Sequence, residues 1–362
     1  MTDRHAQRAT RVLQSLGLST SQAVLATNPT DVRWLSGFSG SFGMVVVSEP
    51  AQILMTDSRY AERAAAEAPA IETYVPKRPN PGALFERLAS TSVRTLLVDE
   101  SHLTVAALRG WSQAASDAGF AVEPVAMPFA ELRKDKDAQE IEALRRACEV
   151  SDIALAEVLP QVRVGMTEKE LAFLLETTMV RCGAQDRAFE SIVAAGEHSA
   201  IPHHSPTSRP IGRGDLLKID FGALVDGYHA DETRTFVIGQ PADWQVEIHA
   251  VVAASQLAGR QALRAGVTLQ EVDHASRQVI VDAGYGENFN HGLGHGVGLQ
   301  IHEEPFFSPT GTSTLAAGYV LTIEPGVYLP GQGGVRIEDT LAVGQDSAES
   351  LTTTPRELRV LC

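Results

Sequence analysis

The stretch KIDFGALVDGYHAD, residues 218–231, places two aspartates on either side of a tight turn. Asp226-Gly227 is a strong signal for a two-residue hairpin loop, flanked by LKIDFGAL and YHADETRTFVI as the two strands. In that register position 220 pairs with 233 and position 222 with 231, so Asp220 and Asp231 point to one face as diagonal neighbours, about 7–8 Å apart at the backbone. Two carboxylates so placed favour a cation between them. Asp226 itself is a favoured turn residue.

A second hairpin repeats this pattern in LTIEPGVYLPGQGGVRIEDT, residues 321–340. A turn centred on Gly331 places Glu324 and Glu338 directly opposite each other on one face. Each acid follows an apolar or small residue in a strand-like run, where an unpaired buried charge would be costly. Together with the two aspartates they form a set of four inward-facing acids.

Three histidines lie in the segment HGLGHGVGLQIHEEP, residues 291–305: His291, His295 and His302. The spacing of the first two would suit a helical zinc site, but the glycines between them disfavour a helix and favour strand and loop. One histidine with four carboxylates suits a hard or borderline divalent ion such as Mn²⁺. Two ions about 3.5–4 Å apart would use all five ligands and favour hydrolytic chemistry.

The composition restricts the class of protein. With 362 residues, 44% of them hydrophobic and 21% charged, the chain is long enough for two globular domains. The formal charge of −15 argues against nucleic acid and anionic membranes as partners. Three cysteines without motif spacing predict free thiols in a reducing compartment. The N-terminal segment carries arginines without an apolar core and no long apolar run follows, so we expect a cytoplasmic protein.

The periodicity divides the chain near residue 128. Residues 1–128 alternate helical segments with the strands GMVVVS, ILMTD and TLLVDE, which predicts an α/β domain. Residues 129–362 begin with a long amphipathic helix whose start has capping-box spacing at Asp137 and Glu140. Helices over about 167–182, 243–264 and 269–282 and several hairpins follow, which predicts an α+β domain that holds the candidate site.

The ordered set Asp220, Asp231, His295, Glu324 and Glu338, within HGLGHGVG, TIEPGVY and GVRIEDT, resembles the M24 or pita-bread metallopeptidases. This family includes methionine aminopeptidases, Xaa-Pro aminopeptidases, Xaa-Pro dipeptidases (prolidases) and the metal-free creatinases. The resemblance covers the whole chain, strongly over about 190–342. It implies a creatinase-like N-terminal domain, which mediates oligomerisation and closes part of the pocket, and a pita-bread catalytic domain.

The resemblance implies a role for each matching residue. Asp220 holds one metal ion, His295 and Glu324 hold the other, and Asp231 and Glu338 bridge them; Glu324 also handles the proton of a bridging water. His203 and His302 match outer histidines that steady the substrate carbonyl and the tetrahedral intermediate, with His204 as an alternative to His203. Supporting or substrate-lining roles fall to His291, Phe306, Tyr328 and Arg336, although core packing or an ion pair is an alternative for Tyr328 and Arg336.

The implied function is cleavage of the N-terminal Xaa-Pro bond of peptides by a hydroxide that bridges two divalent ions, Mn²⁺ first and Co²⁺ or Zn²⁺ as alternatives. The extra N-terminal domain argues against a methionine aminopeptidase, and the complete ligand set argues against a creatinase or a non-catalytic binding module. A homodimer or higher homo-oligomer is implied. Asp31 or Trp34, in NPTDVRWLSGFSGS, could reach a substrate, including one in a neighbouring subunit.

Substrate length separates the two leading functions. A strict dipeptidase must hold the carboxylate of the C-terminal proline, which needs a cationic partner. Between His302 and Arg336 the sequence contains no Lys or Arg, and Arg336 is expected to pair with Glu338. The apolar wall that begins at Phe306 and Phe307 favours a longer peptide, hence an aminopeptidase with Xaa-Pro dipeptidase as the alternative.

Overall fold

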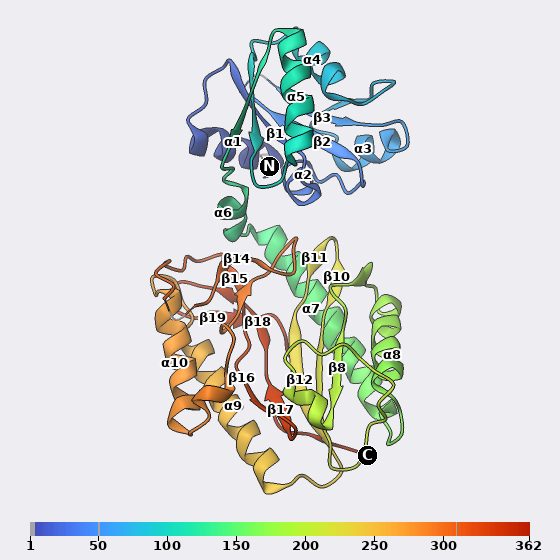
Figure 1. Cartoon of the computed structure of the whole chain (residues 1–362), viewed down its shortest axis with the longest axis vertical. Helices are drawn as coiled ribbons and strands as arrows, with labels where there is room; N and C mark the ends of the chain where they lie inside the picture. The colour runs from blue at the N-terminus through green and yellow to red at the C-terminus, as the bar shows by residue number, and fades with distance from the viewer. Residues whose placement is uncertain (1–3, 50, 309) are drawn as a thin grey trace. The chain divides into compact units, whose positions relative to one another are not determined.

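The computed structural model describes residues 4–49, 51–308 and 310–362. The chain divides into two compact units, Met1–Leu132 and Arg133–Cys362 (Figure 1). Sequence periodicity predicts the change at about residue 128, just before the short helix α6 (Phe129–Lys134) in which the units meet along the chain. Each unit is described by itself.

The first unit is built on a six-stranded mixed sheet in the order β4-β3-β2-β1-β5-β6. Strands β1 and β5, β5 and β6, and β3 and β4 are parallel, whereas β2 is antiparallel to both β1 and β3. The predicted strands GMVVVS, ILMTD and TLLVDE are confirmed as β2, β3 and β5. The strands are β1 (Gln22–Ala26), β2 (Gly43–Val47), β3 (Gln52–Thr56), β4 (Glu72–Tyr74), β5 (Thr95–Asp99) and β6 (Ala121–Val125).

Helices flank this sheet and bury its apolar residues. They are α1 (Arg4–Leu16), α2 (Pro29–Ser36), α3 (Ala61–Glu67), α4 (Pro81–Leu88) and α5 (Val105–Ala118). The core includes Phe85, whose ring lies edge-on to Trp111 at 5.9 Å between centroids. Asp31 and Trp34 lie on α2 and are both buried, so in the single chain neither presents an exposed side chain.

The second unit has four long helices, all of which the sequence predicts. They are α7 (Ala138–Val158), α8 (Glu168–Arg181), α9 (Asp243–Ala262) and α10 (Leu269–Asp282). The capping box predicted at the start of α7 is present, because Asp137 accepts from the Glu140 amide and Glu140 accepts from the Asp137 amide. Short 3₁₀ turns cover Leu159–Gln161, Gly196–Ala200 and Gly286–Asn288.

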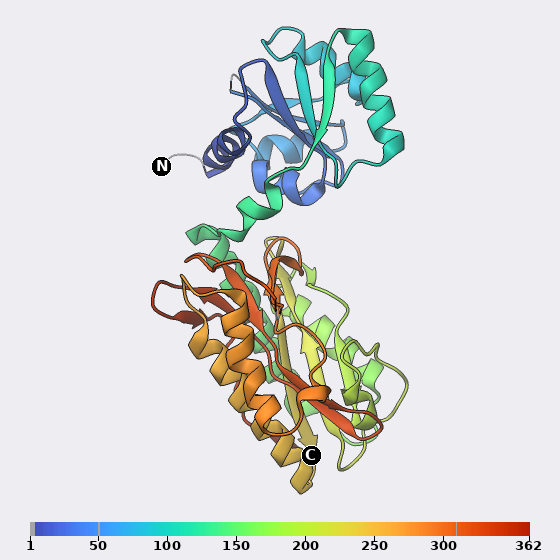
Figure 2. The ribbon, with the colours of Figure 1, turned by 60° about the vertical axis from the view of Figure 1, so that its left-hand side comes forward.

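Sheets that are antiparallel except for the parallel pair β12 and β20 lie between the helix pairs, with α7 and α8 on one side and α9 and α10 on the other (Figures 1 and 2). One hydrophobic core joins α7 and α8 to the sheet β20-β12-β9-β8. The other joins α9 and α10 to the strands of β14-β13-β15-β18-β19 and of the hairpin β16-β17. A small sheet, β11-β10-β7, completes the unit. This is the α+β architecture that the sequence predicts.

The strands of the second unit are mostly short. They are β7 (Asp186–Arg187), β8 (Ile192–Ala195), β9 (Leu216–Phe221), β10 (Ala223–Val225), β11 (Tyr228–His229), β12 (Glu232–Ile238), β13 (His295–Gly296), β14 (Glu303–Phe306), β15 (Val320–Ile323), β16 (Gly326–Leu329), β17 (Gly333–Arg336), β18 (Asp339–Val343), β19 (Ala348–Ser350) and β20 (Val360–Leu361).

Both predicted hairpins are present in the predicted register. Val225 pairs with Tyr228 across the Asp226-Gly227 loop, and Asp220 pairs with Thr233 farther along the same ribbon. Both loop residues have positive φ, 49° and 77°, as a type I′ turn requires. In the second hairpin Leu329 pairs with Gly333 around Gly331, and β15 continues the register against β18 beyond Glu324.

Among the described residues, no helix combines the length and the apolar character needed to cross a membrane. The three cysteines are free thiols, as the sequence predicts.

Candidate metal centre and active site

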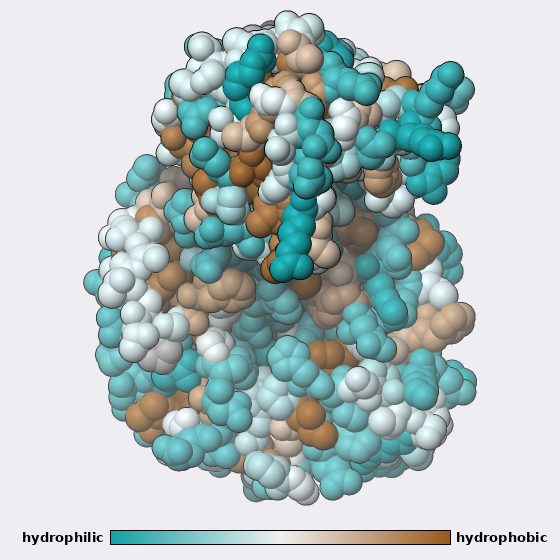
Figure 3. Space-filling model, turned by 45° about the horizontal axis from the view of Figure 1, so that its top comes forward, coloured by the Kyte–Doolittle hydropathy of each residue, from teal (hydrophilic) through white to brown (hydrophobic). Residues whose placement is uncertain are grey.

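The second unit contains a cavity of about 810 Å³ between its antiparallel sheets. This volume lies within the roughly 300–1,000 Å³ typical of small-molecule sites. The surface of the unit is hollowed in Figure 3, with polar residues inside the hollow and apolar residues along its sides. The predicted site residues that line the cavity are His203, Asp220, Asp231, His291, His295, His302, Phe306, Glu324, Arg336 and Glu338.

The five predicted ligands come together although they are spread over more than a hundred residues. Asp231, His295 and Glu338 each offer a ligand atom, and these atoms lie within 4.8 Å of one another. His295 Nε2 is 3.5 Å from a carboxylate oxygen of Asp231 and 3.5 Å from one of Glu324. The hairpin of Asp231, the segment of His295 and the hairpin of Glu324 and Glu338 therefore converge on one point.

Glycine makes this convergence possible at Gly294. A Cβ atom there would lie 2.2 Å from the Thr322 carbonyl oxygen, and its φ of 159° is at the edge of the region that favours glycine. The close approach lets the Thr322 hydroxyl accept from the His295 amide at 3.1 Å. The glycine-rich segment thus serves to press His295 against β15, in the strand-and-loop form that the sequence predicts.

Burial and mutual repulsion perturb the acids. Burial, the Asp220 charge and the Glu324 charge raise the pKa of Asp231 well above its usual range. Burial, with Asp231 and Glu324 as charged neighbours, does the same to the pKa of Glu338. Burial raises the pKa of Glu324 to about 8, against the opposing effect of Arg336. Acids held this way bind protons at neutral pH unless another cation replaces the protons.

The donor set fits divalent metal ions. Within the described chain, the buried Oδ1 atom of Asp220, which lines the cavity, has no hydrogen-bond partner and so leaves an acceptor free. Burial lowers the pKa of His295 to about 4, so its imidazole is neutral. His295 Nδ1 lies 3.0 Å from the Gly296 carbonyl, which fixes the proton on that nitrogen and leaves Nε2 as a lone-pair donor. Oxygen ligands with one neutral imidazole suit Mn²⁺ or a similar ion.

Arg336 is fully engaged by the wall of the site. Its guanidinium forms an ion pair with Asp220 and donates to the Tyr328 hydroxyl at 2.9 Å and to the Pro202 carbonyl at 3.2 Å. The sequence predicts pairing with Glu338, and this is wrong in detail. Arg336 Nε donates to the Thr233 hydroxyl at 3.0 Å, which in turn donates to Glu338 at 2.6 Å. Thr233 thus stands between the arginine and that glutamate.

Tyr328 and His291 continue this chain of hydrogen bonds. The Tyr328 hydroxyl is 2.9 Å from His291 Nε2, and His291 Nδ1 is 2.8 Å from the Gly292 carbonyl. Burial, aided by the Arg336 charge, lowers the pKa of His291 to about 4. His291 lines the cavity. Tyr328 is buried and is not among the described residues that line the cavity, which favours the core-packing alternative for Tyr328 over contact with substrate.

The outer histidines separate into two environments. His302 lies on the cavity with its ring edge-on to that of His295, 4.4 Å between centroids. Both His203 and the adjacent His204 line the cavity; His203 is exposed, whereas His204 is buried and lies 2.9 Å from Glu168. The exposure of His203 favours it as the substrate-facing residue, with His204 as the alternative. Phe306 is 48% exposed on the cavity wall, and Phe307 is buried beneath it.

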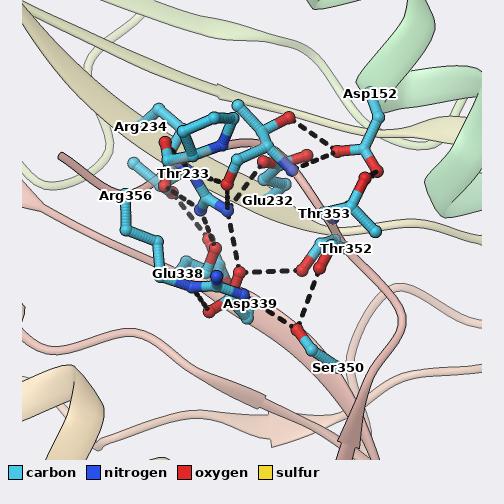
Figure 4. Close-up of polar contacts among 12 residues, drawn as sticks. Asp152, Glu232, Thr233, Arg234, Glu338, Asp339, Ser350, Thr352, Thr353 and Arg356 are labelled. Atoms are coloured by element: carbon cyan, nitrogen blue, oxygen red, sulfur yellow. Dashed lines mark hydrogen bonds and ion pairs between the residues drawn. The ribbon is translucent and has the colours of Figure 1, made fainter. Parts of the chain in front are cut away.

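A buried polar network supports the strands on the side away from the ligands (Figure 4). Because strand side chains alternate between faces, Arg234 and Asp339 point away from the cluster formed by Asp231 and Glu338. Arg234 donates to Asp339 at 2.8 Å and to the Thr354 carbonyl at 2.7 Å. Asp339 also accepts from Thr352 and Arg356. The network ties β12 to β18 and so fixes the spacing of Asp231 and Glu338, the ligands that immediately precede these strands.

Sequence reasoning missed several residues of the site. Thr233 and Lys218 could have been found, because each lies two residues from a predicted ligand, Asp231 and Asp220 respectively, along an extended segment and so shares its face. The amine of Lys218 lies 5.1 Å over the Tyr328 ring. The buried Glu168 gave no such signal. Phe189 and Glu190 also line the cavity.

Comparison with known proteins agrees with the fold and with this site. Residues 142–345 match metallopeptidase family M24, and residues 8–134 match the creatinase/prolidase N-terminal domain. An uncharacterised peptidase of Bacillus subtilis is 36% identical over 342 residues, which is 93% of this chain and 95% of that protein.

Two solved structures are similar over nearly the whole chain. An Xaa-Pro dipeptidase from Bacillus anthracis superposes with a TM-score of 0.93 at 33% identity, covering 99% of both chains. An X-Pro aminopeptidase from Thermotoga maritima superposes with a TM-score of 0.92 at 37% identity, covering 98% of this chain and 100% of that one. Fold and donor set together define a two-domain metallopeptidase. The chain belongs to metallopeptidase family M24, with a creatinase N-terminal domain and a pita-bread catalytic domain.

Proposed function

We propose that this protein is a dinuclear-metal Xaa-Pro aminopeptidase that removes the residue preceding a proline at the second position of a peptide. The convergence of Asp220, Asp231, His295, Glu324 and Glu338 in one cavity supports the metal site. Asp220 would hold one ion, His295 and Glu324 the other, and Asp231 and Glu338 both. Two bound divalent ions, which we expect to be Mn²⁺, supply an activated water and electrophilic stabilisation of developing charge.

The residues of the chain supply the remaining chemistry. Glu324 lines the cavity beside His295, 3.5 Å from its Nε2 atom, and would be the proton acceptor for the attacking water. His302 and His203 line the same cavity and can donate hydrogen bonds to a carbonyl oxygen as negative charge develops on it. Phe306 offers an exposed apolar surface beside His295, suited to a proline ring.

The state of Arg336 supports an aminopeptidase over a dipeptidase. Among the cavity-lining residues in the described part of the chain, Arg336 is the sole Arg or Lys. Its guanidinium already contacts Asp220, Tyr328, Thr233 and the Pro202 carbonyl. A dipeptide would need a cation for its proline carboxylate, whereas the carbonyl of a longer peptide does not. The alternative is an Xaa-Pro dipeptidase, the activity named for the Bacillus anthracis protein.

The test compares kcat/KM for Ala-Pro and Ala-Pro-Ala with saturating Mn²⁺. We expect the tripeptide to be preferred. Preference for the dipeptide would refute the aminopeptidase and require a carboxylate-binding cation from outside this cavity. Failure to cleave either peptide, with two ions bound per chain, would refute Xaa-Pro specificity altogether.

A further inference from the structure

We propose that two buried residues outside the ligand set, Glu168 and Lys218, are positioning residues that fix the loop carrying His203. They would then act on catalysis and leave metal binding intact. This inference rests on the proposed function, in which His203 faces the substrate. The loop runs through residues 201–207, between the 3₁₀ turn Gly196–Ala200 and β9.

Glu168 holds the loop from one side. It is completely buried at the start of α8, yet both of its carboxylate oxygens are saturated. One accepts from the Ala195 amide and lies 2.9 Å from His198 Nδ1. The other lies 2.9 Å from His204 Nε2 and accepts from the amide and hydroxyl of Thr207, at 2.9 and 2.7 Å. Although burial opposes ionisation, these hydrogen bonds lower the pKa of Glu168 to about 2, so the group is a carboxylate.

Lys218 holds the loop from the other side. Its side chain, also completely buried, lies on β9 two residues before Asp220. Its Nζ donates to the carbonyl oxygen of Ile201 at 2.6 Å and to that of Pro202 at 3.3 Å. Arg336 donates to the same Pro202 carbonyl at 3.2 Å. The backbone that immediately precedes His203 thus accepts hydrogen bonds from two side chains, Lys218 and Arg336.

His203 is the residue left between these anchors. The carbonyls before it are fixed by Lys218, and the side chain after it is fixed by Glu168. His204 also lines the cavity, but its side chain is buried, whereas His203 is exposed. A completely buried carboxylate is costly, and the hydrogen bonds of Glu168 and Lys218 go to this loop and to the residues beside it, which indicates that they hold the loop. A displacement of about 1 Å at a substrate-contacting group can cost roughly 10²-fold in rate.

The group Glu168, His198 and His204 is also close enough to hold a metal ion. The Ala195 and Thr207 amides already donate to the two carboxylate oxygens, and each imidazole lies at hydrogen-bond distance from one of them. This pattern is complete without an ion and favours an anchor. Metal analysis of the variants distinguishes the two.

The test uses the full-length Mn²⁺-loaded enzyme with the variants Glu168→Gln and Lys218→Met. Glutamine at position 168 adds an amide donor at a site that already receives five donor groups. Methionine at position 218 keeps the length of lysine without its hydrogen bonds. We expect kcat to fall about 10–100-fold, with KM within about threefold of wild type and two ions retained per chain. Combined with His203→Ala, each variant should lower kcat by less than about threefold beyond His203→Ala alone, because residues that act through one another are not additive.

Glu170→Gln and Lys169→Met are matched controls. Both residues are exposed in the same first turn of α8, and Glu170 contributes only to the capping box with Thr167. The inference would be overturned if the kcat effect of either variant multiplied independently with that of His203→Ala. Loss of one of the two ions would overturn it too, as would a third ion in wild type that disappears in Glu168→Gln. If Glu168→Gln does not fold, Lys218→Met carries the test.

A readout that is independent of turnover separates this inference from the proposed function. The His203 imidazole signal can be assigned in spectra of histidine-labelled protein by its loss in His203→Ala. Glu168→Gln and Lys218→Met should each shift or broaden it, and the controls should not. An unchanged signal would refute the anchors even if Xaa-Pro cleavage is confirmed, and a changed one would support them even if that cleavage is absent.

Discussion

Replacing Glu338 with glutamine should make the stability of the fold nearly independent of bound metal ions. Glu338 is buried among Asp231, Glu324 and Asp220, and it accepts a hydrogen bond from Thr233 at 2.6 Å. Glutamine keeps the shape and can still accept that bond, so the fold should persist. It removes one negative charge from the cluster and one ligand shared by both ions. We therefore expect a metal-free variant at least as stable as wild type, with little stabilisation by Mn²⁺ and no turnover.

The structure sets the size of both effects. The ligand atoms of Asp231, His295 and Glu338 lie within 4.8 Å of one another, and two ionised carboxylates at that distance repel by roughly 3 kcal/mol at an effective dielectric constant of about 20. Because proton uptake already relieves part of this repulsion in wild type, the free energy of unfolding of the variant in EDTA should exceed that of wild type by on the order of 1–3 kcal/mol. Wild type should gain about 3–4 kcal/mol from Mn²⁺ at 100–1,000 times its Kd. At roughly 2–4 °C per kcal/mol, that is about 6–16 °C in Tm.

Thermal melting at pH 8 in EDTA and in Mn²⁺ measures both effects in four samples. Glu304→Gln is the matched control, because Glu304 is an exposed residue of β14 at the edge of the sheet that contains β18, and this variant should respond to Mn²⁺ as wild type does. An equal rise in Tm for Glu338→Gln and wild type would show that Glu338 does not hold the ions, and the assignment of the bridging carboxylates would fail.

Two further predictions concern protons and the outer histidines. In the metal-free protein, Glu324 has a folded pKa of about 8 against 4.5 when unfolded, so the folded state binds more protons between these values and the free energy of unfolding should fall as pH rises. The lowered pKa values of His291 and His295, about 4, have the opposite effect on stability, but only below about pH 6.5. Between pH 6.5 and 8, melts in EDTA should therefore show a decrease in the free energy of unfolding on the order of 1–2 kcal/mol, and Mn²⁺ should suppress this decrease. His302→Ala should lower kcat about 10²–10³-fold with two ions retained, and loss of an ion would instead make His302 a ligand.

The registers of both hairpins were predictable because turn chemistry and strand alternation are local. Asp226-Gly227 supplies the two positive φ angles that a two-residue loop needs, and Gly331 supplies one of 75°. Once the turn is fixed, a period of two assigns every side chain to a face, so Asp220 and Asp231 could be placed together without coordinates. Five acids and histidines in an ordered set then indicate a metal site even though their distances are unknown.

The groups that complete the site depend on contacts distant in sequence, which a local pattern does not contain. Glu168 and Glu170 look alike in the sequence, as two acids in the first turn of one helix. Glu170 forms an exposed capping box, whereas Glu168 is buried under the His203 loop because residues 195 and 207 fold over it. Arg336 likewise has its partner in Asp220, 116 positions away, and not in the glutamate two residues along.

The electrostatic cost of the acid cluster explains why it needs positive charge both from Arg336 and from protons or metal ions. Asp220, Asp231, Glu324 and Glu338 would repel one another strongly if all were ionised, and within the described residues Arg336 is the one guanidinium that forms an ion pair with a carboxylate of the set. One fixed positive charge offsets one carboxylate and leaves a deficit of positive charge in a buried space. Protons or divalent ions must supply the remainder. Arg336 cannot leave to bind a substrate carboxylate without exposing Asp220, so the same charge balance that recruits two metal ions argues for a substrate that brings no second carboxylate to this wall.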